Sequence, residues 1–389
     1  MKITKLESFL ANAGVRNFLF VRLHTDCGIT GIGEASLEWQ EQTVRTFLHE
    51  FLEEHYIIGA NPFDVESAVG RMIRDQYQGG ATAMTAISGV EIAMWDIIAK
   101  DCGKPLYQLL GGRCHESLPA YANGWYGGVR SPEDYAERAK NVVNKGYTAL
   151  KLDPFGVAWK ELPRAGLERV MRILDAIRMA VGDEIGLMIE GHGRFNVETA
   201  VEIAQALTPY HLAWFEEPIS PDQVDLLSEI KSKASIRIAA GERLYTLPEF
   251  YRLISKRAAD IVQMDIAHCG GVLMSKKIAS IAMAQELTVS PHCSIGPVAL
   301  AAALHFDFST PNCNIQEAFG EFDAPWRDAL VQGWNPIRQG AFYLSDRPGL
   351  GLELDESEIL RHPYVKNSFP SLWDDRWHES FTSVSADPQ

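Results

Sequence analysis

From Leu118 onward, eight short apolar runs alternate with amphipathic helical stretches, and this alternation constrains the fold more than any other feature of the sequence. Strand patterns that alternate with helices predict βα units and a parallel sheet, and eight such units are typical of a barrel. We therefore predict a parallel (β/α) barrel. Its strands are expected in the runs LPAYAN, YTALKLD, GLMIE, LAWFEE, IRIAAGE, IVQMD, LTVSPH and NIQE.

The part of the chain before the barrel has a different pattern. Residues 2–9 and 18–25 alternate apolar and polar side chains, as half-buried strands do, and a third short strand is expected in ITGIGEA. Helical patterns follow at 41–54, 63–77 and 83–100. A group of strands followed by a group of helices predicts a small α+β domain.

These patterns divide the chain into three parts. The α+β domain is placed at residues 1–117 and the barrel at residues 118–333. The remaining segment, 334–389, is rich in proline and glycine and is expected to pack back onto the other domains.

Charge and composition exclude several classes of protein. The formal net charge is −15, and a chain this acidic repels polyanions, so nucleic acid is not an expected partner. Hydrophobic residues make up 46% and charged residues 22%, which is typical of a globular protein rather than a disordered one. No apolar run approaches the ~18 residues that span a bilayer, so no membrane partner is expected. The six cysteines form no C-x-x-C pair, which favours reduced thiols and a cytoplasmic location.

The third to eighth expected strands each end in an ionisable side chain. Successive gaps between them are 26, 26, 23, 27 and 25 residues, close to the ~25–30 residues of one βα unit in a barrel. Equivalent strand ends converge on the C-terminal mouth, where barrel active sites lie. The side chains expected to meet there are Glu190, Glu216, Glu242, Asp265, His292 and Glu317.

Three of these carboxylates, Glu190, Glu216 and Glu242, end adjacent strands and therefore share one small volume. Buried carboxylates are unfavourable unless they are paired or bind a metal. Because the ligand atoms are all oxygens, a hard divalent cation is favoured, and Mg²⁺ is the prediction. The alternative is that the three glutamates pair with Lys151 and Arg243 without a metal.

The next two strands end in Asp265 and His292. A carboxylate beside an imidazole fixes its tautomer and raises its basicity, as in general-base dyads; the alternative is a buried structural pair. His192 lies two residues past the end of the third strand and can face the same mouth, unless it is an exposed loop histidine. Lys151 and Asp153 close the second strand, where both can face the site or form a structural ion pair.

Other ionisable residues are not assigned to the site. Glu217 follows a metal-ligand candidate directly and should point to the opposite side of its strand. The histidines at 268, 305 and 211 have no such context and are expected to be structural or at the surface.

Several motifs together resemble the enolase superfamily, mandelate racemase subgroup, over nearly the whole chain. They are SGVEIAMWDIIAK, KPLYQLLGG, FEEP, AAGER, QMD, SPH and RPGLGLELDE. The resemblance implies an α/β protein with a (β/α)7β TIM-like barrel and an N-terminal α+β capping domain that the C-terminal tail completes. Within the subgroup, the chain is similar to sugar-acid dehydratases of the galactonate and gluconate type, through YANGWY, KLDPFG, EGHGRFN, PHCSIGPVALAAALHFDF and DAPWRD.

This resemblance implies a role for each site residue. The three glutamates would bind one Mg²⁺ per subunit, His292 would accept the C2 proton, and Asp265 would raise its basicity. His192 would donate a proton to the leaving hydroxyl. Lys151 and Glu317 would stabilise the enediolate, and Glu317 can donate a hydrogen bond only if protonated, a form that a crowded acidic rim should favour.

Two departures from the family pattern and several substrate contacts complete these expectations. Many relatives end the second strand in K-x-K, where Asp153 stands here, so a two-base racemase is not expected. The first metal ligand is Glu190 where Asp is usual. Specificity is expected from capping-domain loops near 11–18 and 74–82, with Trp39, Trp125 and Trp326 as candidates at the rim. Substrate contacts are predicted for Asp153, Trp326, Trp125 and Asn123.

The predicted function is dehydration of an aldonate to a 2-keto-3-deoxy acid. The partner would be a small acid sugar, and the protein is expected to form a homo-oligomer, from dimer to octamer. The alternatives are a cycloisomerase or epimerase that uses the same enediolate, a metal-dependent hydrolase on the same barrel, and a non-catalytic sugar-acid binding protein.

Overall fold

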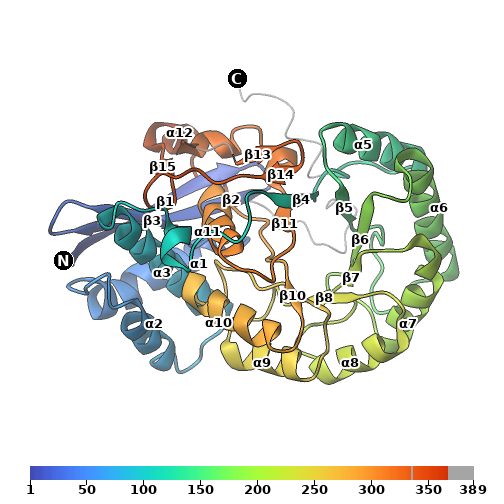
Figure 1. Ribbon diagram of the computed structural model, residues 1–389, viewed down its shortest axis with the longest axis horizontal. Coiled ribbons are helices and arrows are strands. Elements are labelled where there is room, and N and C mark those ends of the chain that lie inside the picture. Colours follow the sequence, from blue (N-terminus) through green and yellow to red (C-terminus); the bar gives the residue numbers. More distant parts are fainter. Residues whose placement is uncertain (334–335, 367–389) are drawn as a thin grey trace.

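The computed structural model describes residues 1–333 and 336–366 and begins with an α+β capping domain (Figure 1). Its antiparallel sheet has the order β1-β2-β3. The strands are β1 (Ile3–Ala13), β2 (Arg16–Thr25) and β3 (Thr30–Glu34), and the helices that follow are α1 (Glu41–Phe47), a π-helix η1 (Leu48–Ile57), α2 (Val65–Arg74), α3 (Ala81–Asp101) and α4 (Leu106–Leu109). The helix expected over 41–54 is therefore split between α1 and the π-helix.

Helix α3 is the buried centre of the capping domain. It approaches β3 so closely that a Cβ on Gly33 would collide with the backbone oxygen of Gly89, so glycine is required there. By length and composition α3 is the one described helix that is apolar enough to cross a membrane, and 83% of that apolar window is buried inside the structure. Its apolar character is thus accounted for by packing.

The second domain is a closed parallel barrel, as the alternating pattern predicts. Its strands are β4 (Leu118–Ala122), β5 (Ala149–Leu152), β6 (Gly186–Glu190), β7 (Trp214–Glu216), β8 (Ile238–Ala240), β9 (Ile261–Val262), β10 (Thr288–Val289) and β11 (Gln316–Ala318). Strands β4 to β10 are neighbours in chain order, and β11 pairs with β4. A parallel bridge joins Val289 in β10 to Cys313, which lies three residues before β11.

Seven helices connect these eight strands, which gives the (β/α)7β architecture. They are α5 (Pro132–Asn144), α6 (Arg164–Val181), α7 (Val197–Ala206), α8 (Val224–Lys233), α9 (Leu247–Ser255), α10 (Val272–Met283) and α11 (Pro297–Phe308), with a short 3-10 turn η2 (Thr208–Tyr210) after α7. The helices lie outside the ring of strands (Figure 1).

The interior of the barrel is a packed apolar layer beneath a polar one. A separate core cluster contains Tyr121, Met188 and Trp214 from three different strands. Because side chains two residues apart share a face, the residues two positions further along each strand also point inward, at the C-terminal mouth. The polar and ionisable side chains therefore lie at the C-terminal end of the barrel, and the apolar cluster fills the barrel beneath them.

Buried carboxylates of the capping domain dock it onto the barrel. Glu34 accepts hydrogen bonds from the backbone N–H groups of Gly296, Val298 and Ala299 at 2.7, 3.1 and 2.9 Å, where α11 begins. Glu91 caps α10 in the same way, and burial raises the pKa of Glu91 to about 7. A carboxylate at a helix N-terminus satisfies free N–H groups and complements the helix dipole.

The chain beyond the barrel returns to the capping domain. Its short elements are η3 (Gly320–Phe322), η4 (Arg327–Leu330), β12 (Val331–Gln332), β13 (Ile337–Arg338), β14 (Ala341–Phe342), β15 (Glu353–Leu354) and α12 (Glu356–Arg361). Strand β14 pairs with β4, and the backbone N–H of Asn12 donates to the carbonyl of His362 at 2.7 Å. Residues 334–335 and 367–389 of the predicted C-terminal segment lie outside the described residues.

Candidate active site

A cavity of about 310 Å³ lies where the C-terminal mouth of the barrel meets the capping domain. The capping domain contributes Arg16 and the segment 37–40 to its wall. The barrel contributes side chains from seven of its eight strands or from the loops that follow them. Those predicted from the sequence are Asn123, Lys151, Glu190, His192, Glu242 and His292.

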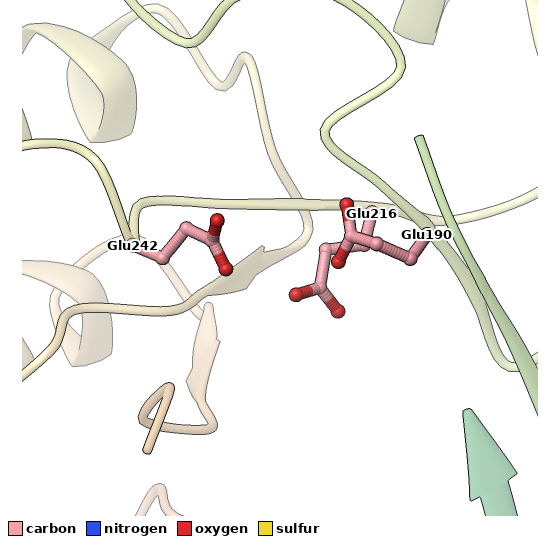
Figure 2. A group of neighbouring side chains, drawn as sticks. All are labelled: Glu190, Glu216 and Glu242. Atoms are coloured by element: carbon pink, nitrogen blue, oxygen red, sulfur yellow. The ribbon is translucent and has the colours of Figure 1, made fainter. Parts of the chain in front are cut away.

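Three carboxylates lie close together at the C-terminal mouth of the barrel (Figure 2), and two of them, Glu190 and Glu242, line this cavity. Glu190 and Glu216 end β6 and β7, and Glu242 lies two residues beyond β8. One oxygen from each lies within 4.8 Å of the others, and Glu190 and Glu216 are buried while Glu242 is half-buried. The structure thus brings together the three glutamates that the strand spacing predicts.

The charge balance of this cluster fits a divalent cation. Lys151 contacts Glu216 at 2.7 Å and Glu190 at 3.4 Å, so the predicted ion pair and the carboxylate cluster coexist. Burial and the neighbouring charge of Glu190 nevertheless raise the pKa of Glu216 to about 8, despite the opposing effect of Lys151. One lysine does not neutralise three carboxylates, and their oxygens form the donor set that Mg²⁺ prefers.

Arg243 forms its shortest contacts with Glu217, which lies outside the three-carboxylate cluster. Its Nε donates to Glu217 Oε2 at 2.7 Å but lies 4.0 Å from Glu242 Oε1. Glu217 is buried beside the cluster and is not one of its three members. The ion pairs of the alternative are thus present in part: Lys151 pairs with two of the glutamates, whereas the contact of Arg243 with Glu242 is longer than its contact with Glu217.

His292 and Asp265 form a close dyad on one side of the three carboxylates. His292 Nδ1 lies 2.7 Å from Asp265 Oδ2, and His292 Nε2 lies 3.4 Å from Glu242 Oε2. Burial lowers the pKa of His292, but Glu242, Glu317 and Asp265 outweigh it and hold that pKa well above its usual value. With Nδ1 on the aspartate, Nε2 is the nitrogen available to a substrate.

His268 also belongs to this side of the cavity, contrary to the sequence expectation. It lines the cavity, and its Nε2 lies 3.7 Å from Asp265 Oδ2. Its Nδ1 lies 2.9 Å from Thr85 Oγ1 in the capping-domain helix α3. The signal available in the sequence was its position three residues after Asp265. The other two unassigned histidines behave as expected, since His305 is buried away from the cavity and His211 is exposed.

Glu317 is an ionised acceptor, which corrects the expectation of a protonated donor. Its Oε1 accepts from Asn123 Nδ2 at 2.7 Å and lies 3.2 Å from Lys151 Nζ, and its Oε2 accepts from the backbone N–H of Cys293 at 2.8 Å. Burial alone would raise its pKa, but Lys151 and His292 lower the pKa of Glu317 to about 2. Glu317 therefore acts through the cation Lys151 and through Asn123.

His192 lies on the other side of the carboxylate cluster. Its backbone N–H donates to Glu190 Oε1 at 2.7 Å, and its ring Nδ1 lies 2.9 Å from Asp153 Oδ2. Asp153 is also paired with Arg194 and does not line the cavity. The predicted direct substrate contact by Asp153 is therefore replaced by a contact with His192. Arg194 was missed because its partner lies 41 residues earlier in the chain.

The tryptophans predicted at the rim divide into two groups. Trp39 lines the cavity. Trp125 is buried and donates from Nε1 to the carbonyl of Lys151 at 2.8 Å, while Trp326 donates to the carbonyl of Asn12 at 2.8 Å and stacks on His362. Neither Trp125 nor Trp326 lines the cavity, although Trp125 holds the backbone of the lining residue Lys151.

The capping-domain contribution agrees with the prediction at Arg16 and differs from it in the second segment. Arg16 comes from the expected loop near 11–18, and its side chain is almost fully buried against the ring of Phe319. The segment 37–40 takes the place expected for 74–82, from which no residue in the described part of the chain lines the cavity.

Comparisons with known proteins agree with this geometry. The chain matches the enolase C-terminal domain-like family over residues 134–358 and the mandelate racemase/muconate lactonizing enzyme N-terminal domain over residues 10–111. It is 37% identical to the D-gluconate/D-galactonate dehydratase of Picrophilus torridus over 87% of this chain and 86% of that protein. It is 34% identical to the D-galactonate dehydratase of Variovorax paradoxus over 99% of this chain and all of that protein.

Solved structures show the same architecture. The mandelate racemase/muconate lactonizing enzyme from Jannaschia sp. CCS1 superposes with a TM-score of 0.86 at 33% identity, covering 94% of this chain and 98% of that one. The enzyme of the same description from Sulfitobacter sp. gives a TM-score of 0.87 at 33% identity, covering 95% and 97%. The fold, the family matches and the cluster of strand-end carboxylates lead to one conclusion: the chain belongs to the mandelate racemase/muconate lactonizing enzyme family of the enolase superfamily.

Proposed function

We propose that this protein is a Mg²⁺-dependent sugar-acid dehydratase, a hydro-lyase that converts an aldonate of the gluconate or galactonate type into a 2-keto-3-deoxy acid. One observation carries the proposal: three clustered carboxylates lie between two histidines, and each histidine contacts an aspartate through Nδ1. The dehydratases of Picrophilus torridus and Variovorax paradoxus, similar over most of their length, support the same reaction.

The metal would be held by Glu190, Glu216 and Glu242, whose oxygens converge within 4.8 Å. When bound, Mg²⁺ supplies positive charge that stabilises a substrate carboxylate as it takes up negative charge. Lys151 adds a second positive charge at the same mouth, because its ammonium group is held by Glu216 and Glu317. A proton alpha to a carboxylate is very weakly acidic, so this concentration of positive charge is essential.

The two histidines divide the proton transfers. His292, with Nδ1 on Asp265, accepts the C2 proton through Nε2, which leaves an enediolate. His192, with Nδ1 next to Asp153, donates a proton from Nε2 to the 3-hydroxyl as the C3–O bond breaks and water departs. The resulting enol tautomerises to the 2-keto-3-deoxy acid. Each transfer is expected to contribute about 10²–10⁴-fold in rate.

A screen of aldonates and aldarates tests this proposal. The purified protein with Mg²⁺ is expected to form a 2-keto acid from at least one aldonate, and chelation should abolish the product until Mg²⁺ is restored. The matching aldose is the control, because without a carboxylate it offers neither a metal ligand nor an enediolate. Turnover that persists after exhaustive metal removal, or equal turnover of the aldose, contradicts the mechanism.

The same experiment separates the alternatives. An epimerase or cycloisomerase would consume the substrate without forming a 2-keto acid, and ¹H NMR in D₂O distinguishes these outcomes. A binding protein would retain the aldonate unchanged. A hydrolase with a bridged metal pair is disfavoured, because the metal-ligand cluster found among residues 1–333 and 336–366 is a single set of three carboxylates.

Two further features are part of the proposal. We propose a homo-oligomer, between dimer and octamer, located in the cytoplasm. Light scattering on the purified protein measures the assembly, and cell fractionation measures the location. A monomer in solution, or recovery in a membrane fraction, would contradict these two points without affecting the chemistry.

A further inference from the structure

The backbone at His192 has an uncommon conformation. His192 has φ +48° and Gly193 has φ +68°, so two successive residues lie in the left-handed region. A non-glycine residue adopts that region only where the surroundings hold it there. This turn directs the backbone N–H of His192 to Glu190 Oε1 at 2.7 Å and leaves the imidazole facing Asp153.

Asp153 is itself fixed at both carboxylate oxygens. Its Oδ1 accepts from the backbone N–H of Phe155 at 3.0 Å, and its Oδ2 contacts His192 Nδ1 at 2.9 Å and Arg194 Nη2. The side chain is 2% exposed. An aspartate held in this way can adopt one orientation only, and that orientation presents Oδ2 to the imidazole.

Arg194 holds Asp153 in this orientation through an ion pair. Its side chain is fully buried and donates from Nε to the carbonyl of Gly191 at 2.9 Å and from Nη1 to the carbonyl of Gly156 at 2.7 Å. Its remaining nitrogen, Nη2, pairs with Asp153 Oδ2 and also lies 3.3 Å from His192 Nδ1, farther than the 2.9 Å between that Nδ1 and Asp153 Oδ2. The rigid fork of a guanidinium spaces these three contacts, which a flexible ammonium group cannot do.

The dyad on the opposite side of the carboxylate cluster is built in the same way. Asp265 Oδ1 accepts from the backbone N–H of Ala267, two residues ahead, at 2.8 Å, and Asp265 Oδ2 contacts His292 Nδ1 at 2.7 Å. Asp153 uses the backbone N–H two residues ahead and the Nδ1 of His192 in the same arrangement. Two Asp–His pairs of one design therefore flank the three carboxylates.

We propose that Asp153, locked by Arg194, is a positioning residue that directs His192 Nε2 at the leaving hydroxyl and so commits the enediolate to dehydration. This inference rests on the proposed dehydratase function. With Nδ1–H donated to Asp153, the proton on Nε2 goes to the 3-hydroxyl oxygen, the C3–O electron pair leaves with it as water, and the enediolate electrons form the C2–C3 double bond. The C2 proton stays on His292, so atoms and charges balance.

The test compares Asp153→Asn with Asp265→Asn. Dehydration of the best aldonate should fall about 100-fold in Asp153→Asn, within the range for loss of an acid catalyst. A 3-deoxyaldonate has no leaving hydroxyl and reports only on the C2 proton. Its C2 exchange in D₂O should stay near the wild-type rate in Asp153→Asn and disappear in Asp265→Asn.

An isotope effect gives a second readout that does not depend on solvent reaching His292. In Asp153→Asn, protonation of the leaving group becomes rate-limiting, so the rate difference between C2-protonated and C2-deuterated aldonate should shrink relative to wild type. Circular dichroism and Mg²⁺ titration calorimetry establish that each variant is folded and binds the metal. A merely structural role for Asp153 would lower both steps together and leave the isotope effect unchanged.

Arg194→Lys keeps the proposal testable if Asp153→Asn does not fold, because it retains the positive charge beside Asp153 and removes the fork. It should lower dehydration about tenfold while C2 exchange of the 3-deoxyaldonate persists. If the wild-type protein dehydrates an aldonate but the variants keep its isotope effect and lose dehydration and C2 exchange to the same extent, the positioning role alone is overturned. Absence of dehydration by the wild-type protein on any aldonate overturns the proposed function and this inference together.

Discussion

His305 should make the stability of this protein depend on pH in a defined window. It lies on α11 and joins three parts of the chain, because Nδ1 accepts from the backbone N–H of Tyr107 at 3.1 Å and Nε2 contacts the carbonyl of Leu350 at 3.2 Å. One nitrogen that accepts and one that donates define a neutral imidazole. Burial lowers the pKa of His305 from 6.5 to about 4.

The sign of the effect follows from these two pKa values. Between about pH 6.5 and pH 4 the unfolded chain binds a proton at His305 that the folded protein excludes, so the free energy of unfolding falls as pH falls. The difference of about 2.5 pKa units at ~1.4 kcal/mol each corresponds to roughly 3 kcal/mol over the full window. The loss should begin below pH 6.5 and be complete near pH 4, while higher pH should have no effect through this group.

The assay is urea denaturation of wild-type and His305→Asn protein between pH 7 and pH 4.5, in chelator so that metal binding does not contribute. Asparagine retains an acceptor for the N–H of Tyr107 but does not titrate. The difference in unfolding free energy between the two proteins should therefore shrink as pH falls. His211→Asn is the matched control, because His211 is exposed and asparagine tolerates its left-handed backbone. Parallel pH profiles for wild type and His305→Asn would refute the reasoning.

Glu216→Gln removes one ligand charge and should weaken Mg²⁺ binding, as measured by calorimetry on folded protein. The loss of affinity should exceed the ~10–100-fold that is typical when a residue that only contacts a metal ligand is mutated. His292→Asn should lose both dehydration and C2 exchange in D₂O, whereas His192→Asn should lose dehydration by about 10²–10⁴-fold; undiminished dehydration in His192→Asn would remove this residue from the chemistry. Lys151→Met should lower kcat/KM by about 10²–10³-fold, and a wild-type value would show that its charge is dispensable. Glu91→Ala should lower the free energy of unfolding by about 1–3 kcal/mol in urea titration, because two N–H groups of α10 lose their acceptor; an unchanged midpoint would contradict the docking role.

The strand-end residues could be predicted from the sequence because a barrel repeats one local unit. Each strand has its own apolar run and its own terminal side chain, and closure of the barrel brings these strand ends together at one mouth. Glu190, Glu216 and Glu242 therefore meet without any signal that links them directly. The family resemblance added roles to these positions, and the geometry of His292 with Asp265 agrees with those roles.

Features that depend on the backbone between elements could not be predicted in this way. The π-helix η1 continues directly from α1, and the 3.6-residue periodicity gave no sign of the change in hydrogen bonding. Trp326 lies in the DAPWRD segment on which the resemblance to sugar-acid dehydratases partly rests, yet its indole contacts Asn12 and His362. A short motif does not show what its side chains contact in the folded protein. Trp326 could therefore not be assigned to the substrate from the sequence alone.

Asp153 shows how a departure from a family pattern acquires meaning only in three dimensions. On the sequence, an aspartate in the position of a base lysine removes a base and disfavours two-base chemistry. In the structure the same carboxylate contacts His192, so the group that faces the cavity on this side is an imidazole supported by an aspartate. The substitution exchanges a lysine base for a positioned histidine. A histidine so placed can protonate a leaving hydroxyl, which is the step that separates dehydration from simple proton exchange at C2.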